Sequence, residues 1–199
     1  DRAAGGHDIN QVVDLEGIGD GLQVLAEDAE LTSVKNKLAA IGNETYYFDA
    51  NGIAVTGWKD VNGSRMYFGS DRKMKTGLLS LSGKKYYLDD NGKMQTGWLK
   101  RGKKSYYLSS DGHAVTGWQT IGGHRYYFKD NGAMTVGISK IDGSRYYFDK
   151  SSGHLSFGWV TSGSKKYFFS PSAEGKAATG YWDINGTIFH FNEEGVLQN

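Results

Sequence analysis

The sequence has no cysteine and one proline among its 199 residues, and leucine, isoleucine and valine are sparse. Without cysteine, neither a disulfide framework nor a thiolate metal site can form. No apolar run approaches the ~20 residues of a membrane span, and no signal peptide opens the chain, which we expect to be a mature or excised fragment. A net charge of +1 gives no general attraction to nucleic acid or to an anionic membrane.

Motifs for catalysis and metal binding are also missing. The five histidines match no metal-ligand spacing, and neither His-Glu-x-x-His nor Gly-x-Ser-x-Gly occurs. Most acids occupy turns, as Asp90, Asp111 and Asp130 do, where hydrogen bonds to the local backbone account for them. Such turns offer too few oxygens for the roughly 6–8 ligands of calcium. We therefore expect no catalytic residue, no metal, no cofactor and no enzyme activity in this chain.

Glycine and aromatic residues are abundant instead, with 29 glycines and 14% aromatics. Aromatic triplets recur at a spacing of 20, later 21 and 22 residues. They begin at Tyr46, Met66, Tyr86, Tyr106, Tyr126, Tyr146, Tyr167 and Phe189. A second marker runs in phase with them, as Gly-Trp at Trp58, Trp98, Trp118 and Trp159, as Gly-Leu at Leu78, as Gly-Ile at Ile138 and as Gly-Tyr at Tyr181. A shared period in two markers indicates a repeat protein.

Each repeat has the pattern of a β-hairpin. A dipeptide such as Asn62-Gly63 or Asp142-Gly143 separates the Trp-led segment from the triplet, and both residue types tolerate positive φ. A second turn after the triplet, such as Asn51-Gly52, leads to a small or flexible residue such as Ala54. One hairpin cannot bury its aromatic face alone, so neighbours must stack. The sequence predicts an all-β hairpin solenoid of about eight repeats over residues 42–199.

Residues 1–41 show no repeat and form a separate N-terminal segment in this interpretation. Leu31, Val34, Leu38 and Ile41 follow a helical spacing, so we predict short helices over 22–30 and 32–41. The segment is either the tail of an upstream domain or a cap on the first hairpin, and the sequence does not decide between them.

The units 96–117 and 116–137 resemble the bacterial cell-wall-binding repeat superfamily, and the resemblance extends over residues 43–199. This superfamily includes choline-binding modules, the glucan-binding repeats of streptococcal glucosyltransferases and the C-terminal repeats of large clostridial toxins. The resemblance implies a solenoid of stacked hairpins, secretion or a cell-surface location, and binding of polymers or glycans between neighbouring repeats.

The residue before each tyrosine pair separates the branches of this superfamily. Choline-binding repeats resemble the pattern but carry a tryptophan there, as one wall of an aromatic cage around a quaternary ammonium. This chain has mostly basic or small residues at the position, including Arg65, Lys85, Ser105, Arg125 and Arg145. A cation would repel choline, so we expect the toxin or glucan-binding branches instead. The long repeats that carry toxin glycan sites are absent, and only the extension at 170–176 departs from the short period.

Sugar recognition needs a flat aromatic face and hydrogen-bonding groups at its rim. The candidate binding residues are Trp58, Trp98, Trp118, Trp159, Tyr87, Tyr107, Tyr127 and Tyr147 for the rings, with Lys85, Arg125 and Arg145 as donors. The same rings must also build the core, so each has a packing role beside the binding role. Leu78 and Ile138 replace tryptophan, and we predict that their junctions are spacers that do not bind.

The leading hypothesis is a non-catalytic module that holds a secreted bacterial protein on cell-wall polysaccharide or an α-glucan. The alternatives are adhesion to host oligosaccharides, as in the toxins, and a structural spacer of a larger surface enzyme. Nucleic acid is not an expected partner, because the positive charge is spread thinly over the repeats. The sequence predicts neither the oligomeric state nor the identity of the polymer.

Overall fold

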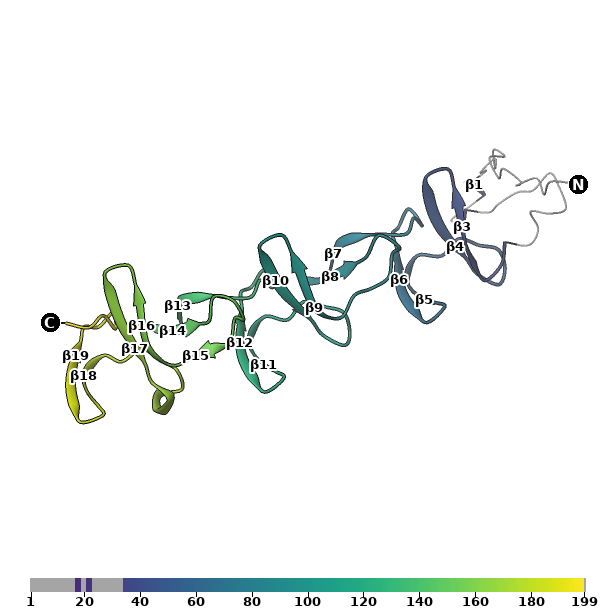
Figure 1. Cartoon of the computed structure of the whole chain (residues 1–199). Coiled ribbons are helices and arrows are strands. Elements are labelled where there is room, and N and C mark those ends of the chain that lie inside the picture. The colour runs from purple at the N-terminus through teal and green to yellow at the C-terminus, as the bar shows by residue number, and fades with distance from the viewer. Residues whose placement is uncertain (1–16, 19–20, 23–33, 199) are drawn as a thin grey trace, which may run out of the picture. The chain divides into compact units, whose positions relative to one another are not determined.

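The computed structural model describes residues 17–18, 21–22 and 34–198, which form hairpins joined by short turn segments (Figure 1). A two-residue pair, β1 (Gly17–Ile18) and β2 (Gly21–Leu22), comes first. The hairpins that follow are β3–β4 (Lys37–Ile41, Glu44–Phe48), β5–β6 (Gly57–Val61, Ser64–Phe68), β7–β8 (Gly77–Leu81, Lys84–Leu88), β9–β10 (Gly97–Arg101, Lys104–Leu108), β11–β12 (Gly117–Ile121, His124–Phe128), β13–β14 (Gly137–Ile141, Ser144–Phe148), β16–β17 (Gly158–Ser162, Lys165–Phe169) and β18–β19 (Gly180–Ile184, Thr187–Phe191). The all-β hairpin repeat predicted from the sequence is confirmed.

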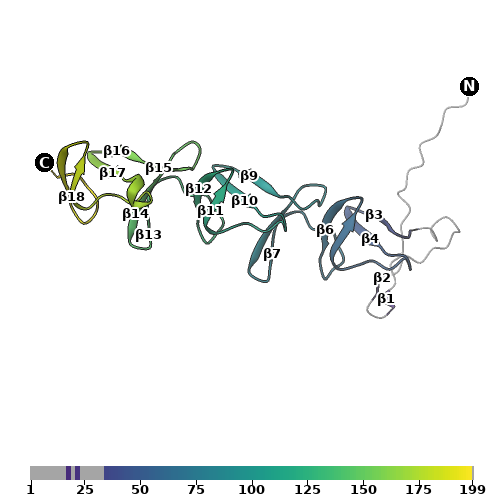
Figure 2. The same ribbon diagram turned by 90° about the horizontal axis from the view of Figure 1, so that it is seen from below.

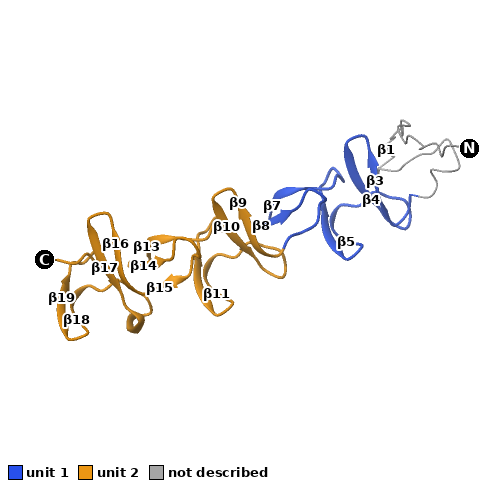
Figure 3. Cartoon of the chain, viewed as in Figure 1, with its two compact units in different colours: residues 1–95 blue, residues 96–199 orange. Residues whose placement is uncertain are grey.

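The chain divides into two compact units, residues 1–95 and 96–199 (Figure 3). The first contains the hairpins from β3 to β8 and the second those from β9 to β19. Within each unit, consecutive hairpins point in different directions, as a comparison of Figure 1 and Figure 2 shows. Side chains of the same repeat position therefore face different sides of a unit in neighbouring repeats.

Two-residue turns set the register of every hairpin. Asn62 and Gly63 both have positive φ, 50° and 75°, which matches the right-handed twist of the strands they join. At the tip of β9–β10 only the first turn residue, Gly102, has positive φ, at 57°, and Lys103 follows it. The register places each Gly-Trp tryptophan directly opposite the middle residue of its own triplet, as Trp58 lies opposite Tyr67.

The helix predicted over 32–41 is wrong. Lys37–Ile41 is strand β3, which pairs with β4 so that Leu38 lies opposite Tyr47. Lys37-Leu38 therefore occupies the Gly-Trp position of a repeat whose marker is too altered to recognise, and the first hairpin crosses the predicted boundary at residue 41. Pairing with an aromatic strand overrides the weak helical spacing. The helix predicted over 22–30 falls largely outside the described residues, and Leu22 itself ends strand β2.

The third residue of each triplet forms the core. Phe48, Phe68, Leu88, Phe128, Phe148 and Phe169 are fully buried, and Leu108 and Phe191 nearly so. Each bridges the small or flexible residue that follows its turn, as Phe128 bridges Met134; at Phe148 this bridge extends into strand β15 (Leu155–Ser156). Since these residues are spaced along the whole chain, each unit is stabilised by a series of small cores and not by one large core.

Within each unit, the same backbone hydrogen bond recurs between neighbouring repeats. The N–H of Met74 donates to the carbonyl of Thr45 at 2.8 Å, and Met134 donates to Ser105 in the same way. The turn glycine of the next repeat then lies against this residue: a Cβ at Gly132 would come within 3.1 Å of the Ala114 side chain. The residue that follows the turn of its own repeat, such as Ala114, must have a small or flexible side chain because a glycine of the next repeat lies directly against it.

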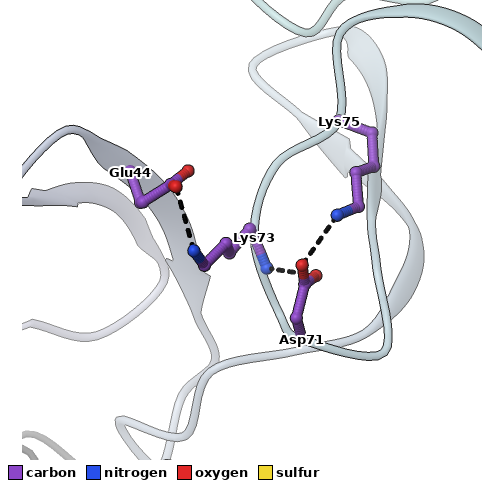
Figure 4. Close-up of polar contacts among 4 residues, drawn as sticks. All are labelled: Glu44, Asp71, Lys73 and Lys75. Carbon is purple, nitrogen blue, oxygen red and sulfur yellow. Dashed lines mark hydrogen bonds and ion pairs between the residues drawn. The ribbon is translucent and has the colours of Figure 1, made fainter.

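Exposed ion pairs add to these contacts between repeats. In the first unit, the Lys73 ammonium lies 2.9 Å from Glu44 of the preceding hairpin (Figure 4). A second pair, Lys75 and Asp71 at 2.8 Å, lies within the same turn segment as Lys73 and joins no repeats. The hydrogen bond from Lys75 lowers the pKa of Asp71, and the hydrogen bond to Glu44 raises the pKa of Lys73.

A second carboxylate joins repeats in the other unit. Glu194, after the last hairpin, pairs with Arg145 and lies 3.8 Å from the Lys140 ammonium. Arg145 also donates to the Glu194 carbonyl oxygen at 3.0 Å. The hydrogen bond and charge of Arg145, followed by the charge of Lys140, lower the pKa of Glu194.

The extension noted in the sequence at 170–176 contains a short 3₁₀ turn, Pro171–Ala173, which ends at Glu174 in the left-handed region. The hydrogen bond between repeats survives it, because the N–H of Ala177 donates to Arg145 at 2.8 Å. The longer spacing is therefore absorbed in the turn and leaves the stacking unchanged.

Leu88→Ala and Leu78→Ala form a matched pair within hairpin β7–β8, since Leu88 is fully buried and Leu78 is 68% exposed. We expect Leu88→Ala to lower the free energy of unfolding by about 2–5 kcal/mol, through lost burial and a cavity. Leu78→Ala should change it by less than about 0.5 kcal/mol. Urea titrations followed by circular dichroism measure both, and equal losses would contradict the core assigned here.

The Glu194 ion pairs predict a pH-dependent contribution to stability. A carboxylate whose pKa is lowered on folding stabilises the folded state above its ordinary value of 4.5, and this contribution is lost as the pH falls through the folded-state pKa. The urea midpoints of the wild type and Glu194→Gln should therefore differ at neutral pH and converge in acid. Glu193→Gln is the control, and a gap of constant size at all pH values would refute the contribution.

Candidate functional site

The four Gly-Trp tryptophans each lie in a junction between two repeats. Trp98 packs edge-on against Tyr107 of its own hairpin at 5.1 Å between ring centroids and against Tyr126 of the next hairpin at 5.0 Å. Trp118 repeats this arrangement with Tyr127 at 5.3 Å and Tyr146 at 4.9 Å. Three rings thus meet edge-on at each junction, two from one repeat and one from the next, and Phe128 and Phe148 of the next repeats also contact Trp98 and Trp118.

The other two tryptophans have the same geometry. Trp58 meets Tyr67 at 5.2 Å and Tyr86 at 5.1 Å. Trp159 meets Phe168 at 5.1 Å and Phe189 at 5.0 Å, so its walls carry no hydroxyl groups. The junction is therefore a repeated structure whose polar groups differ from one copy to another.

A cation lies over the tryptophan ring in three of these junctions. The guanidinium carbon is 5.3 Å from the Trp58 centroid for Arg65 and 4.6 Å from the Trp118 centroid for Arg125. The Lys166 ammonium is 4.6 Å from Trp159. The register explains this, since the residue before the tyrosine pair lies diagonally across the hairpin from the tryptophan, on the same face. Such a contact stabilises an exposed pair by about 0.5–1 kcal/mol.

The Trp98 junction differs from the other three. Ser105 occupies the position before its tyrosine pair, and among the described residues no cation lies over the Trp98 ring. Trp98 is 47% exposed, against 37% for Trp159, while Trp58 and Trp118 are half-buried. Trp98 thus offers an open aromatic face beside two tyrosine walls.

Some of the remaining candidate residues lie at tryptophan junctions and others do not. Tyr107 and Tyr127 lie in tryptophan junctions, whereas Tyr87 lies opposite Leu78 and Tyr147 opposite Ile138. Tyr147 packs instead on Phe169 at 5.9 Å. The half-buried Lys85 lies opposite Ser80 in the hairpin that carries Leu78. Arg145, predicted as a ligand donor, is held by Glu194.

Sequence reasoning missed the wall that comes from the next repeat. Tyr86, Tyr126 and Tyr146, the first residues of their triplets, supply this wall and were not among the candidate residues. It also left Arg65 and Lys166 out of the candidate residues, although they hold the same repeat position as Arg125. Aligning the repeats position by position would have found both cations.

Among the histidines of the second unit, His113 hydrogen-bonds to the Ser109 hydroxyl at 2.9 Å, and the other three make ring contacts. His124 and His154, from neighbouring repeats, stack at 3.8 Å between centroids, and His190 stacks on Tyr181 at 4.4 Å. The part of the chain that the structure describes has no group of three His, Cys, Asp or Glu residues able to hold a metal ion. It also has no helix long and apolar enough to cross a membrane.

Two family models match the chain. One is described as a choline-binding repeat and matches residues 75–114 and 115–157, and the other is described as a cell wall binding repeat and matches residues 36–54. No curated protein matches the chain. The matches do not support our expectation that the chain lies outside the choline branch. That expectation remains a prediction about the ligand.

Solved structures of Streptococcus pneumoniae proteins share the fold. Choline binding protein F is 31% identical with a TM-score of 0.68, and the match covers 81% of this chain and 58% of that protein. CbpJ from strain TIGR4 is 29% identical with a TM-score of 0.66, with 78% and 63% covered. The modular autolysin LytC is 25% identical with a TM-score of 0.56, with 83% and 39% covered.

This chain therefore spans less than two thirds of each of those proteins. The family matches fall on three stretches of the hairpin repeat, and the structural matches extend over about four fifths of the chain. The chain belongs to the family of choline-binding and cell wall binding repeats.

Proposed function

We propose that this chain is a non-catalytic module that binds a bacterial cell-wall polymer through its tryptophan junctions. The observation that carries the proposal is the same three-ring junction at Trp58, Trp98, Trp118 and Trp159. Choline binding protein F has been solved in the presence of a peptidoglycan analogue and LytC in complex with a synthetic peptidoglycan ligand, which supports a wall polymer as the ligand class.

The ring arrangement suits a sugar chain. An exposed tryptophan face contacts the C–H-rich side of a sugar ring, and the tyrosine hydroxyls at its rim can hydrogen-bond to the sugar hydroxyls. Arg65, Arg125 and Lys166 lie over the tryptophan rings of their junctions and can donate further hydrogen bonds to the polymer. Each junction is small, so the affinity for a polymer comes from several junctions on one chain engaging the same molecule.

Some of the other roles considered from the sequence are compatible with this proposal, and others compete with it. A location on the cell surface and a catalytic domain elsewhere in the full-length protein are compatible with it. An α-glucan or a host oligosaccharide would use the same junctions, and an array of purified glycans distinguishes them. A structural spacer would need no ligand and would tolerate replacement of the exposed rings.

Replacing two tryptophans by the residue that the chain itself uses at Leu78 tests the polymer site. Trp98→Leu with Trp118→Leu keeps an apolar side chain at a position where the fold accepts leucine. We expect this double variant to lose about tenfold or more in affinity for purified cell-wall polysaccharide, because a loss of 1.4 kcal/mol is already about tenfold. Pull-down and calorimetry measure the loss.

Leu78→Ala is the control for the tryptophan variant, since Leu78 holds the same repeat position and is 68% exposed. It should bind the polymer as the wild type does. Circular dichroism confirms that both variants fold. Wild-type affinity in a folded double leucine variant would overturn the proposed site and favour the spacer.

A second candidate ligand is choline, and Ser105 favours it at a single junction. Three tryptophans are covered by the chain's own cations, which shows that these cages accept a positive charge. The argument against choline drawn from basic residues applies to those three junctions and does not apply to Trp98, where Ser105 holds the position. The open Trp98 face, with Tyr107 and Tyr126 as walls, would take the cationic group of an external ligand.

Exchanging the residues before the tyrosine pair tests this candidate. Ser105→Arg should abolish choline binding by covering Trp98, and Arg125→Ser should add a site by uncovering Trp118. Calorimetry with choline should therefore give stoichiometries of about one for the wild type, zero for Ser105→Arg and two for Arg125→Ser. Unchanged choline binding in Ser105→Arg would exclude the Trp98 junction.

A further inference from the structure

Hairpin β9–β10 has a concentration of positive charge that the aromatic junctions do not explain. Lys100, Arg101, Lys103 and Lys104 lie at its tip, all four are exposed, and the hairpin contains no acid. No other described hairpin has more than two Lys or Arg residues. The excess of positive charge is confined to this hairpin, since the whole chain has a net charge of only +1.

Two of these cations lie directly opposite one another. Arg101 and Lys104 are partners in the register at the end of the hairpin. Like charges at directly opposite positions destabilise a strand pair. The equivalent position to Arg101 is apolar in most other hairpins, as with Val61, Ile121 and Ile141. Packing alone therefore favours an apolar residue at this position.

The chain itself shows what such a pair binds. Lys140 and Arg145 are also direct partners across their hairpin, and the Glu194 carboxylate lies against both. Arg145 and the carboxylate form a charge-assisted hydrogen bond, which is stronger than a bond between neutral groups. Glu194 stands in for an anionic group held by two cations on neighbouring strands. None of the ion pairs in the described part of the chain neutralises Lys100, Lys103 or Lys104.

We propose that the tip of hairpin β9–β10 is a binding site for an anionic polymer, one that carries phosphodiester or carboxylate groups at intervals along a flexible chain. Lys100 lies two residues from Trp98 along the same strand face, opposite Ser105, and Lys103 lies in the turn beyond it. The cations thus extend from the edge of the open junction to the end of the hairpin. Three exposed lysines that take part in none of the ion pairs of the described residues fit a polymer better than a single small anion.

The charge pattern favours such a polymer over nucleic acid. Nucleic acid binding without sequence preference uses a continuous basic track with stacking rings. Here the neighbouring turns place acids after the hairpins, including Asp111 and Asp130, and hairpin β11–β12 has Arg125 as its only Lys or Arg. The basic surface of this hairpin is therefore short.

The test compares two sets of three glutamine substitutions in the full chain. Lys100→Gln, Lys103→Gln and Lys104→Gln remove the proposed site, and Lys84→Gln, Lys129→Gln and Lys150→Gln remove the same charge from exposed positions elsewhere. The probes are a glycerol-phosphate oligomer, a galacturonate oligomer with the same number of charges, an oligo-dT of that charge and a neutral dextran oligomer. Fluorescence polarisation at low salt measures the affinities, and circular dichroism verifies folding.

We expect the first set to weaken binding of the anionic oligomers roughly tenfold and the control set less than about threefold. The difference should vanish near 1 M salt, where the screening length is about 3 Å. The tighter of the phosphate and carboxylate oligomers identifies the anion. Equal losses in the two sets would overturn the proposal, and so would oligo-dT binding as tightly as the better anionic oligomer.

The test of the basic hairpin tip can succeed or fail independently of the test of the tryptophan junctions. Glutamine at the three lysines should leave retention of neutral wall polysaccharide unchanged, whereas the double leucine variant at Trp98 and Trp118 should lose it. Either site can therefore fail while the other is upheld.

Discussion

The structure depends on one constraint: no hairpin can cover its own aromatic side chains. Each third triplet residue is fully or almost fully buried, although its hairpin is only two short strands. The missing cover comes from the turn segment of the same repeat and from the rings of the preceding one, as Trp98 packs on Phe128 and Tyr147 on Phe169. Burial of apolar area is the main favourable term in folding, so the stability of the chain lies largely at contacts between neighbours.

This constraint also explains where a ligand can bind. The tryptophan of one repeat reaches the first aromatic residue of the next, so the contact that joins two repeats is also the wall of the junction. A ring that served only the core would be hidden, and a ring that served only a ligand would not hold the repeats together. Partly exposed rings, such as Trp98 and Trp159, contact the next repeat and still keep an accessible surface.

Sequence alone was enough for most of the fold, because period, triplets and turn dipeptides are local signals that repeat. It failed at Lys37–Ile41, where the Gly-Trp marker has become Lys37-Leu38 and only pairing with β4 reveals the strand. It recovered the tryptophans of the candidate site but not Tyr126 or Tyr146 as walls, because the contact spans two repeats and depends on how they stack. The engagement of Arg145 by Glu194 could not be foreseen either, since 49 residues separate the two.

The residue before each tyrosine pair has two separate roles in the structure. Its carbonyl oxygen accepts the hydrogen bond from the next repeat, whatever side chain it carries, as Thr45, Arg65, Ser105, Arg145 and Lys166 all do. Architecture thus depends on the main chain at this position, and the side chain can vary without changing the hydrogen bond between repeats. A duplicated repeat would fit into the stack at once and could then diverge at this one position. Selectivity in such a module can evolve one repeat at a time, while every intermediate along the way remains a folded protein.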